Sequence, residues 1–324
     1  MALKMRRVED APESAELAHP WERTDRRPRA QRRRRLGWQW DGRGLFLLPA
    51  LVYLAGLTFF PMYELVRMSF SHVTPEVLYK PWPFAGLDEF GRAISTPDFS
   101  AALANTLVYV TVVVASGLIG GLLAALVLWR STPLTSFVFG VIVFVWAMPP
   151  LVNGSVWRFM LDQRGLIDSL LVAVHLPAVL WLVDGKLPLI SVALVNAWVA
   201  VPFATIVYRA ALLDIPQEVL EAAAVDGAVP RQIIQYVVIP LLRPVMVVLG
   251  VVTVVYAFRS FDFIYIMTSG GPGTVSTTLP FLAYRLAFQS YQYSIGAATA
   301  VLSVVIVLVM AAVYLRQVRA EERV

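Results

Sequence analysis

The sequence contains no cysteine and only three histidines, and charged residues make up only 15% of it. Without cysteine the chain can have no disulfide, no thiolate metal ligand and no cysteine nucleophile. His19, His72 and His175 are too scattered to match the ligand spacing of a zinc site. A soluble globular chain has about 25% charged residues, and a disordered chain is rich in charge and poor in aromatics. Because 58% of the residues are hydrophobic, we expect a chain that faces lipid, rather than a soluble two-domain enzyme or a disordered protein.

Positive charge is concentrated near the N-terminus. Residues 1–43 contain 12 of the 27 Lys and Arg residues, including the run Arg32–Arg35. Such a basic arm could bind nucleic acid. With long apolar segments downstream, it is better explained as a cytoplasmic tail that lies beside an anionic leaflet and anchors the first membrane span. We therefore expect contact with membrane lipid and no binding of nucleic acid.

Six apolar segments reach the length of about 20 residues that a helix needs to cross the bilayer core. The second, third, fourth and sixth of them contain no charged residue. The predicted fold class is therefore an all-α membrane protein with six transmembrane helices. The expected spans are residues 44–70, 101–129, 132–157, 187–208, 244–268 and 292–315.

The charges of the loops predict the orientation. If the N-terminus is cytoplasmic, 19 of the 27 Lys and Arg residues lie on the inner side, which is the positive-inside bias. An even number of spans then places both termini on that side of the cytoplasmic (inner) membrane. We expect a basic cytoplasmic tail at 1–43, a permease domain at 44–315 with a long cytoplasmic loop at 209–243, and a cytoplasmic tail at 316–324.

The long inner loop has the pattern of a helix followed by a tight turn. Pro216 suits the first position of a helix, with Asp214 as a possible cap. Residues 218–225 contain strong helix formers. Gly227 is suited to the left-handed turn that ends a helix.

A second short helix is expected to follow this turn. Pro230 suits its start, and residues 233–238 are mostly apolar, so the helix should pack on the membrane interface or on a partner. Pro240 and Pro244 are expected to break it before the fifth span.

This loop resembles the signature of permease subunits of binding-protein-dependent ABC importers. In that signature Glu-Ala-Ala, three residues, Gly, nine residues and Ile-x-Leu-Pro follow one another. The chain has Glu221-Ala222-Ala223, Gly227 and Val237-Val238-Ile239-Pro240, with mild departures at two aliphatic positions. Asp226-Gly227-Ala228 and the outer segment 267–273 are similar to the carbohydrate-importing branch. The resemblance implies a type I ABC importer permease fold over residues 44–315.

The resemblance further implies a coupling helix that docks in a cleft of a separate ATP-binding subunit. Its residues would be Glu221, Ala222, Ala223, Asp226, Gly227 and Pro240. The implied partners are a second permease subunit, two ATP-binding subunits that hold ATP and Mg, and an extracytoplasmic solute-binding protein. The chain itself has no P-loop, because its only Gly-Lys pair, Gly185-Lys186, is followed by Leu187. We expect no catalytic residue, cofactor or metal site in this chain, and a transport subunit rather than an enzyme.

Polar residues within spans are costly and usually face an interior. Asn196 lies in the middle of the fourth span, and small and aromatic residues share its face. In the third span Trp146 precedes Pro149-Pro150, which can interrupt a helix, as is common beside transporter sites. Maltose-type permeases are similar in using these regions, although Pro150 and Ala257 lack the polar groups expected there. The predicted substrate path is Trp146, Pro150, Asn196, Val199, Ala200, Phe203, Thr253, Ala257 and Ser260.

The same residues have a purely structural interpretation. Trp146 and Phe203 would then pack helices together, and Asn196 would make an interhelical hydrogen bond. Arg259 and Asp262 have the i,i+3 spacing of a salt pair, although Arg259 could instead attract a sugar phosphate. Gly117 and Gly121 have the spacing of a close helix crossing.

The predicted function is import of a sugar, a di- or oligosaccharide in the favoured interpretation. Glycerol phosphate or another phosphoester is the alternative. An ion-driven secondary transporter would be expected to carry acidic or histidine residues in mid-span, and an intramembrane enzyme paired His, Asp or Glu side chains. The uncharged second, third, fourth and sixth segments carry neither pattern.

Overall fold

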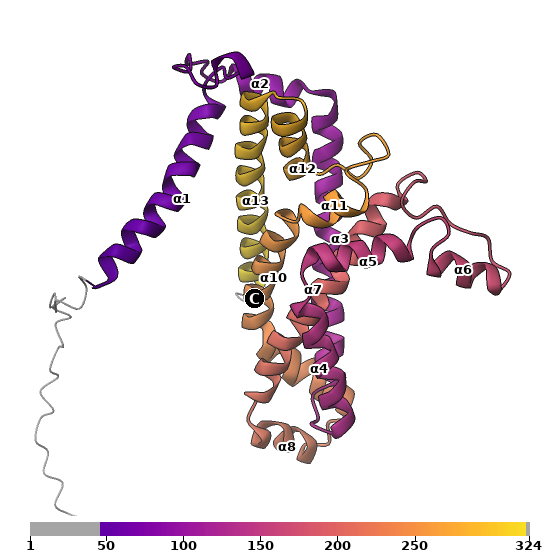
Figure 1. The fold of residues 1–324 in the computed structure, drawn as a ribbon. Helices are drawn as coiled ribbons and strands as arrows, with labels where there is room; N and C mark the ends of the chain where they lie inside the picture. The colour runs from indigo at the N-terminus through magenta and orange to yellow at the C-terminus, as the bar shows by residue number, and fades with distance from the viewer. Residues whose placement is uncertain (1–45, 322–324) are drawn as a thin grey trace, which may run out of the picture. The chain divides into compact units, whose positions relative to one another are not determined.

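The structure, a computed structural model, describes residues 46–321 (Figure 1). The basic tail expected at 1–43, with Arg32–Arg35 and His19, lies outside the described residues. The chain divides into two units, Met1–Leu54 and Ala55–Val324, and the boundary falls inside the first helix. Everything below concerns the second unit unless the first helix is named.

The described residues are helical, and their only β-contact is an isolated bridge between Ser71 and Phe84. Two short turns of π-helix, η3 and η4, interrupt the series, and η2 is a 3-10 turn. In chain order the elements are α1 (Leu48–Ser69), η2 (Pro75–Val77), α2 (Asp88–Ser95), α3 (Pro97–Val127), α4 (Pro133–Ala147), α5 (Pro150–Met160), α6 (Leu166–Ala173), α7 (Leu187–Leu213), α8 (Gln217–Val225), α9 (Pro230–Ile233), η3 (Ile234–Val238), α10 (Ile239–Phe258), α11 (Asp262–Met267), α12 (Leu279–Tyr284), η4 (Arg285–Gln289) and α13 (Tyr293–Glu321).

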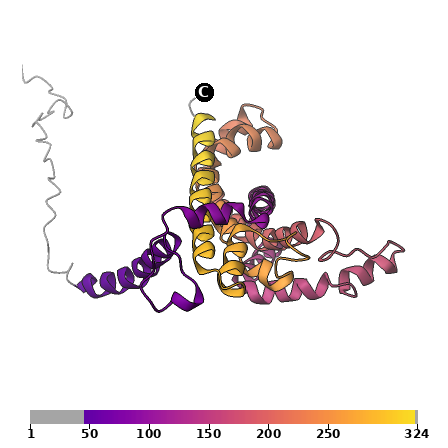
Figure 2. The same ribbon diagram turned by 90° about the horizontal axis from the view of Figure 1, so that it is seen from above.

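Within the described part of the chain, five helical segments are long and apolar enough to cross a membrane, and there are six if a bent helix pair counts as one span. The bent pair is α4 and α5, which meet at 100° where the sequence predicts one span at 132–157. Met148 and Pro149 are both extended, as expected for residues that precede a proline, and neither Pro149 nor Pro150 can donate a backbone hydrogen bond. The expected third span is therefore two helices, and the α5–α6 segment extends away from α13 (Figure 2).

The helix before the fifth span does not break at Pro240 and Pro244, which corrects the expectation from sequence. Residues 230–258 are continuously helical through α9, η3 and α10. In η3 the Ile239 N–H bonds to the Ile234 carbonyl, an i to i−5 bond that widens the turn just before Pro240. Pro240 lies in the first turn of α10, where a proline is tolerated, and Pro244 lies inside α10 without ending it.

The fifth apolar span reaches Met267, close to the expected end at residue 268, but its helix is interrupted on the way. α10 stops at Phe258, and α11 begins at Asp262, so Arg259 and Asp262 do not share a helix. Among the described residues, the ion pairs do not include Arg259 with Asp262, and the predicted salt pair is wrong.

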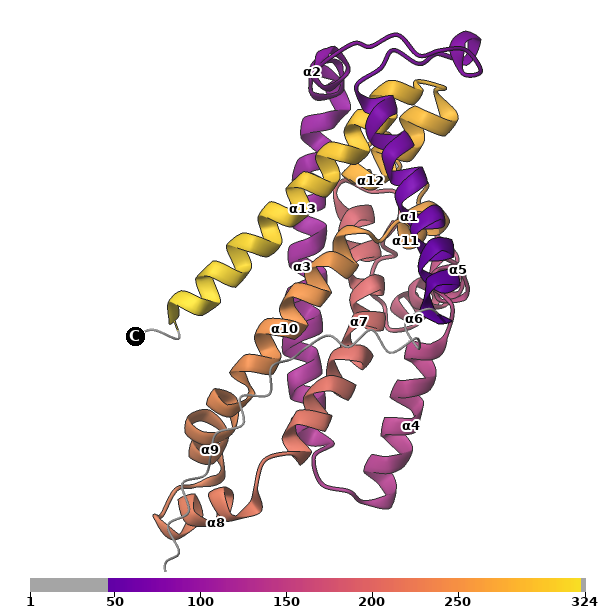
Figure 3. The ribbon, with the colours of Figure 1, turned by 90° about the vertical axis from the view of Figure 1, so that its left-hand side faces the viewer.

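α3 and α7 lie side by side along most of their length (Figures 1 and 3). Glycines on α3 permit this approach, because a Cβ on Gly117 would lie 3.4 Å from the Ala200 Cβ and one on Gly121 would overlap the Ala204 Cβ. The predicted close crossing at Gly117 and Gly121 is therefore confirmed, and its partner is α7.

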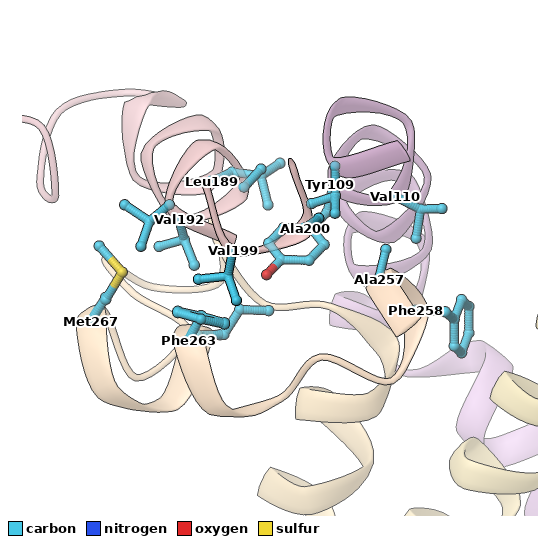
Figure 4. Close-up of a cluster of buried hydrophobic side chains, with 14 of the residues drawn as sticks. Tyr109, Val110, Leu189, Val192, Val199, Ala200, Ala257, Phe258, Phe263 and Met267 are labelled. Carbon is cyan, nitrogen blue, oxygen red and sulfur yellow. The ribbon is translucent and has the colours of Figure 1, made fainter. Parts of the chain in front are cut away.

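The largest buried cluster joins five helices, α3, α7, α10, α11 and α12 (Figure 4). Tyr109 of α3, Val199 of α7, Ala257 of α10 and Phe263 of α11 are each at most 5% exposed. Burial of apolar side chains here fixes α10 and α11 against the α3–α7 pair, so the break between α10 and α11 lies beside α7.

The loop between α11 and α12, which contains the glycine-rich segment 269–273, is held by α3. Asn105 donates from Nδ2 to the Thr274 carbonyl at 3.0 Å and to the Thr277 carbonyl at 3.1 Å. Gly270 and Gly273 have φ of +84° and +58°, which only glycine adopts at low cost. This loop lies at the same end of the second unit as α2, whereas α8 lies at the opposite end (Figures 1 and 3).

Candidate functional site

A cavity of about 240 Å³ opens between α4, α7 and α10. Its walls are mostly apolar and aromatic, with the Thr253 hydroxyl, the Tyr256 hydroxyl and the Trp146 indole as polar groups. The lining residues are Trp146, Val199, Ala200, Phe203, Val252, Thr253 and Tyr256. A mostly apolar hollow with a few polar groups is the usual form of a small-molecule site.

Trp146 and Phe203 form the aromatic wall of this cavity. Their rings are stacked, with centroids 6.1 Å apart and planes inclined by 23°. Trp146 is 46% exposed and therefore keeps a free ring surface. It reaches this place because α4 ends one residue later, at the bend before Pro149.

The cavity brings together five of the nine residues predicted for the substrate path: Trp146, Val199, Ala200, Phe203 and Thr253. Val252 and Tyr256 line it as well and were not predicted. Ala257 was predicted because it lies four residues after Thr253 on the same helix face. Tyr256 lies three residues after Thr253, a spacing that also places two residues on one face, so the same reasoning could have predicted it.

The remaining four predicted residues lie elsewhere. Pro150 begins α5 beyond the bend, and Ala257 is 1% exposed. Asn196 is completely buried and donates from Nδ2 to the Ser260 Oγ at 3.0 Å. This is the interhelical hydrogen bond of the structural interpretation, and in this conformation Asn196 and Ser260 do not line the cavity.

A small polar cluster surrounds this hydrogen bond. The Asn196 Oδ1 and the Tyr109 hydroxyl are both buried, and neither has a protein hydrogen-bond partner. Ser260 can reach Asn196 because the α10 helix has ended two residues earlier. An unpartnered buried polar group costs about 1–3 kcal/mol, so this cluster weakens the packing at the helix break.

We expect Asn196 and Ser260 to act as one unit. In a double-mutant cycle of Asn196→Ala and Ser260→Ala, the double variant should lose no more stability than the stronger single variant. The expected coupling between the two side chains is about 0.5–1.5 kcal/mol, measured from thermal unfolding of the purified protein in detergent. Strictly additive losses would show that the hydrogen bond is not formed.

The segment 214–229 forms the helix and turn expected from its sequence, although its N-cap is Pro216 and Asp214 instead caps the end of α7. α8 ends in a Schellman motif, in which the Ala228 N–H bonds to the Ala223 carbonyl at 3.0 Å and the Gly227 N–H to the Ala224 carbonyl at 3.1 Å. Gly227 has a φ of +85°, as this motif requires. α9 then begins at Pro230.

α8 exposes most of its surface, and none of its residues is buried. Glu221, Ala222 and Asp226 are exposed, Ala223 is half-buried, and Glu221 accepts a hydrogen bond from Gln217 Nε2 at 2.7 Å. Val225 is 87% exposed, which leaves an apolar side chain at the tip. The predicted coupling residues Glu221 to Gly227 thus lie together, whereas Pro240 lies apart from α8 on the first turn of α10.

Comparison with known proteins places the chain, with its cavity and its exposed helix α8, in a family. Residues 117–321 match the family described as binding-protein-dependent transport system inner membrane component. The trehalose/maltose transport system permease protein MalF of Thermococcus litoralis is 29% identical over 273 residues, which cover 84% of this chain and 92% of that protein. The diacetylchitobiose uptake system permease protein DasB of Streptomyces coelicolor is 30% identical over 284 residues, which cover 86% and 87%.

A solved structure has the same fold. The crystal structure of a bacterial ABC transporter involved in import of the acidic polysaccharide alginate contains a chain that matches with a TM-score of 0.75 at 24% identity. The match covers 86% of this chain and 94% of that chain. It supports the helical permease fold over most of the sequence.

Proposed function

Because the chain belongs to the family of binding-protein-dependent transport system inner membrane components, we propose that it is a permease subunit that imports a neutral di- or oligosaccharide. The observation that carries the substrate class is the cavity between α4, α7 and α10. It presents the stacked Trp146 and Phe203 rings, its lining includes Thr253 and Tyr256, and none of its lining residues is charged. Aromatic faces suit the apolar faces of sugar rings, and a tyrosine hydroxyl can donate and accept hydrogen bonds. The Thr253 hydroxyl already donates to the Leu249 carbonyl at 2.7 Å, which leaves it as an acceptor.

A phosphoester fits this cavity less well. An anionic phosphate is normally bound by Arg, Lys or backbone N–H groups. Arg259, the candidate for that role, does not line the cavity. The names of the related trehalose/maltose and diacetylchitobiose permeases agree with a neutral saccharide.

We further propose that α8 and the turn at Gly227 dock on an ATP-binding subunit. α8 is exposed along its length and ends in an apolar tip, as a helix that inserts in a partner's groove requires. The complete importer would contain a second permease subunit, two ATP-binding subunits with ATP and Mg, and an extracytoplasmic binding protein. Residues 1–43, 209–243 and 316–324 would face the cytoplasm.

Uptake into proteoliposomes tests this proposal. The complex is reconstituted with its binding protein and offered labelled maltose, trehalose, diacetylchitobiose or glycerol 3-phosphate. We expect uptake of a saccharide that requires ATP on the side of α8 and persists when a protonophore removes the proton gradient. Uptake of glycerol 3-phosphate alone would replace the substrate class, and uptake driven by an ion gradient without ATP would contradict the importer mechanism.

A further inference from the structure

α4 is held to the rest of the second unit by few contacts. None of its fifteen residues is buried, although α4 supplies Trp146 to the cavity. Two aromatic contacts join it to α7: the Trp146–Phe203 stack near one end, and the Phe139 ring beneath the Arg209 guanidinium near the other. Between them Ile142, Val143 and Val145 are only half-buried. Phe139 and Trp146 are seven residues apart, so they lie on the same face of the helix.

Arg209 contacts three elements at once. Its guanidinium carbon lies 4.4 Å from the centroid of the Phe139 ring. Its Nε donates to the Leu128 carbonyl at 3.0 Å, and its Nη2 lies 3.5 Å from the Ser131 Oγ. Leu128 caps the C-terminus of α3, where carbonyls lack helical partners and a cation is favourable. Arg209 therefore joins α7 to the end of α3, to the turn that follows, and to α4.

Arg209 lies on α7 between the cavity residues and the end that leads to α8. α7 runs without interruption from the cavity residues Val199 and Phe203 through Arg209 to Leu213, and α8 begins four residues later. The glycine crossing packs α7 tightly against α3, so these two helices form one body. A movement of α8 that tilts this body reaches α4 through the two aromatic contacts.

We infer that Arg209 is a positioning residue that makes α4, and with it Trp146, follow α7 when α8 moves. Without the guanidinium, α8 would still dock and ATP would still be hydrolysed. Trp146, however, would no longer be fixed in a single position in the cavity wall, because α4 would move independently of α7. This role rests on the proposed function, but its structural part can be measured without any sugar.

The absence of cysteine makes a direct distance measurement possible. Cysteines are placed at Val141 on α4 and Leu194 on α7, which are 46% and 52% exposed and do not line the cavity. They carry spin labels in the complete complex, and the interspin distance is measured by pulsed electron paramagnetic resonance without nucleotide and with ADP-vanadate. Three variants are compared. Arg209→Gln and Phe139→Leu each remove one partner of the contact between the Arg209 guanidinium and the Phe139 ring, and Arg209→Lys keeps the positive charge.

Arg130→Gln is the matched control, because Arg130 lies in the turn between α3 and α4, next to Ser131, and is exposed. Among the described residues its side chain makes no hydrogen bond, ion pair or cation–π contact. We expect a narrow distance distribution in the unchanged complex and in the control. Arg209→Gln and Phe139→Leu should broaden it and lower ATP-dependent uptake about tenfold while ATP hydrolysis persists, and Arg209→Lys should recover part of the uptake.

An unchanged distribution in Phe139→Leu, which leaves the Leu128 hydrogen bond in place, would overturn the inference even if Arg209→Gln fails to assemble. Loss of ATP hydrolysis in parallel with uptake in Phe139→Leu would also overturn it, because the contact would then be needed for assembly only. Broadened distributions in a complex that transports no saccharide would instead refute the proposed substrate and leave the role of Arg209 standing.

Discussion

Gly227→Val is expected to abolish ATP-dependent uptake while the chain remains in the membrane at its normal level. The φ of +85° costs an L-residue about 1–2 kcal/mol, and a β-branched side chain is especially unfavourable there. A Cβ at Gly227 would meet nothing within 4 Å, so the effect comes from backbone strain and not from a clash. The strained turn would change the direction of the chain between α8 and α9 and disrupt the surface that we propose docks on an ATP-binding subunit.

Gly185→Val is the control for this strain. Gly185 also has a positive φ, +53°, and also has open space around its Cβ position, but it lies in the segment between α6 and α7. The two variants impose a similar local cost, one before α7 and the other after α8. We expect Gly185→Val to retain uptake, measured side by side with membrane levels by quantitative immunoblot. Equal loss in both variants would mean that general destabilisation, and not docking at Gly227, explains the result.

Gly121→Val is expected to destabilise the protein itself. Its new Cβ would overlap the Ala204 Cβ and lie about 3.1 Å from the Ala204 carbonyl carbon, so α3 and α7 would have to move apart. Overpacking of this kind costs about 1–3 kcal/mol, and here it acts on the best-packed pair of helices. We expect a lower unfolding temperature in detergent and reduced accumulation in the membrane.

Gly140→Val provides the comparison for Gly121→Val. Gly140 is also in the middle of an apolar helix, but a Cβ there would meet nothing within 4 Å. Replacement of a helix glycine by a residue with a side chain reduces the flexibility of the unfolded chain, so its stability should stay the same or rise slightly. An unfolding temperature for Gly121→Val that equals that of Gly140→Val would contradict the close crossing of α3 and α7.

Hydropathy and local turn chemistry predicted much of the fold. α3, α7 and α13 lie where long uncharged segments occur, and such runs identify helices without knowledge of their neighbours. The Schellman turn at Gly227 and the start of α9 at Pro230 depend on residues within one turn of each other, which is why they could be predicted. The glycine spacing of α3 indicated a close crossing, although its partner helix came only from the structure.

Features that depend on distant contacts were not predicted. The sequence marks Pro149-Pro150 as an interruption, but the 100° between α4 and α5 depends on how each packs. The helix continues through Pro240 after the π-turn η3, for which hydropathy gives no signal. Mid-span position placed Asn196 in the substrate path, whereas the structure pairs it with Ser260 because the break after Phe258 brings that hydroxyl within reach.

The most direct test of the central claim is to tag this chain, extract it gently from its native membrane and identify by mass spectrometry the proteins that accompany it. The account predicts a P-loop ATPase, a second permease subunit and an extracytoplasmic binding protein whose ligand is a saccharide. It also predicts that Gly227→Val loses the ATPase or recovers less of it. A chain that emerges alone or only as a homo-oligomer under conditions that preserve other membrane complexes would contradict the docking of α8 and the importer mechanism.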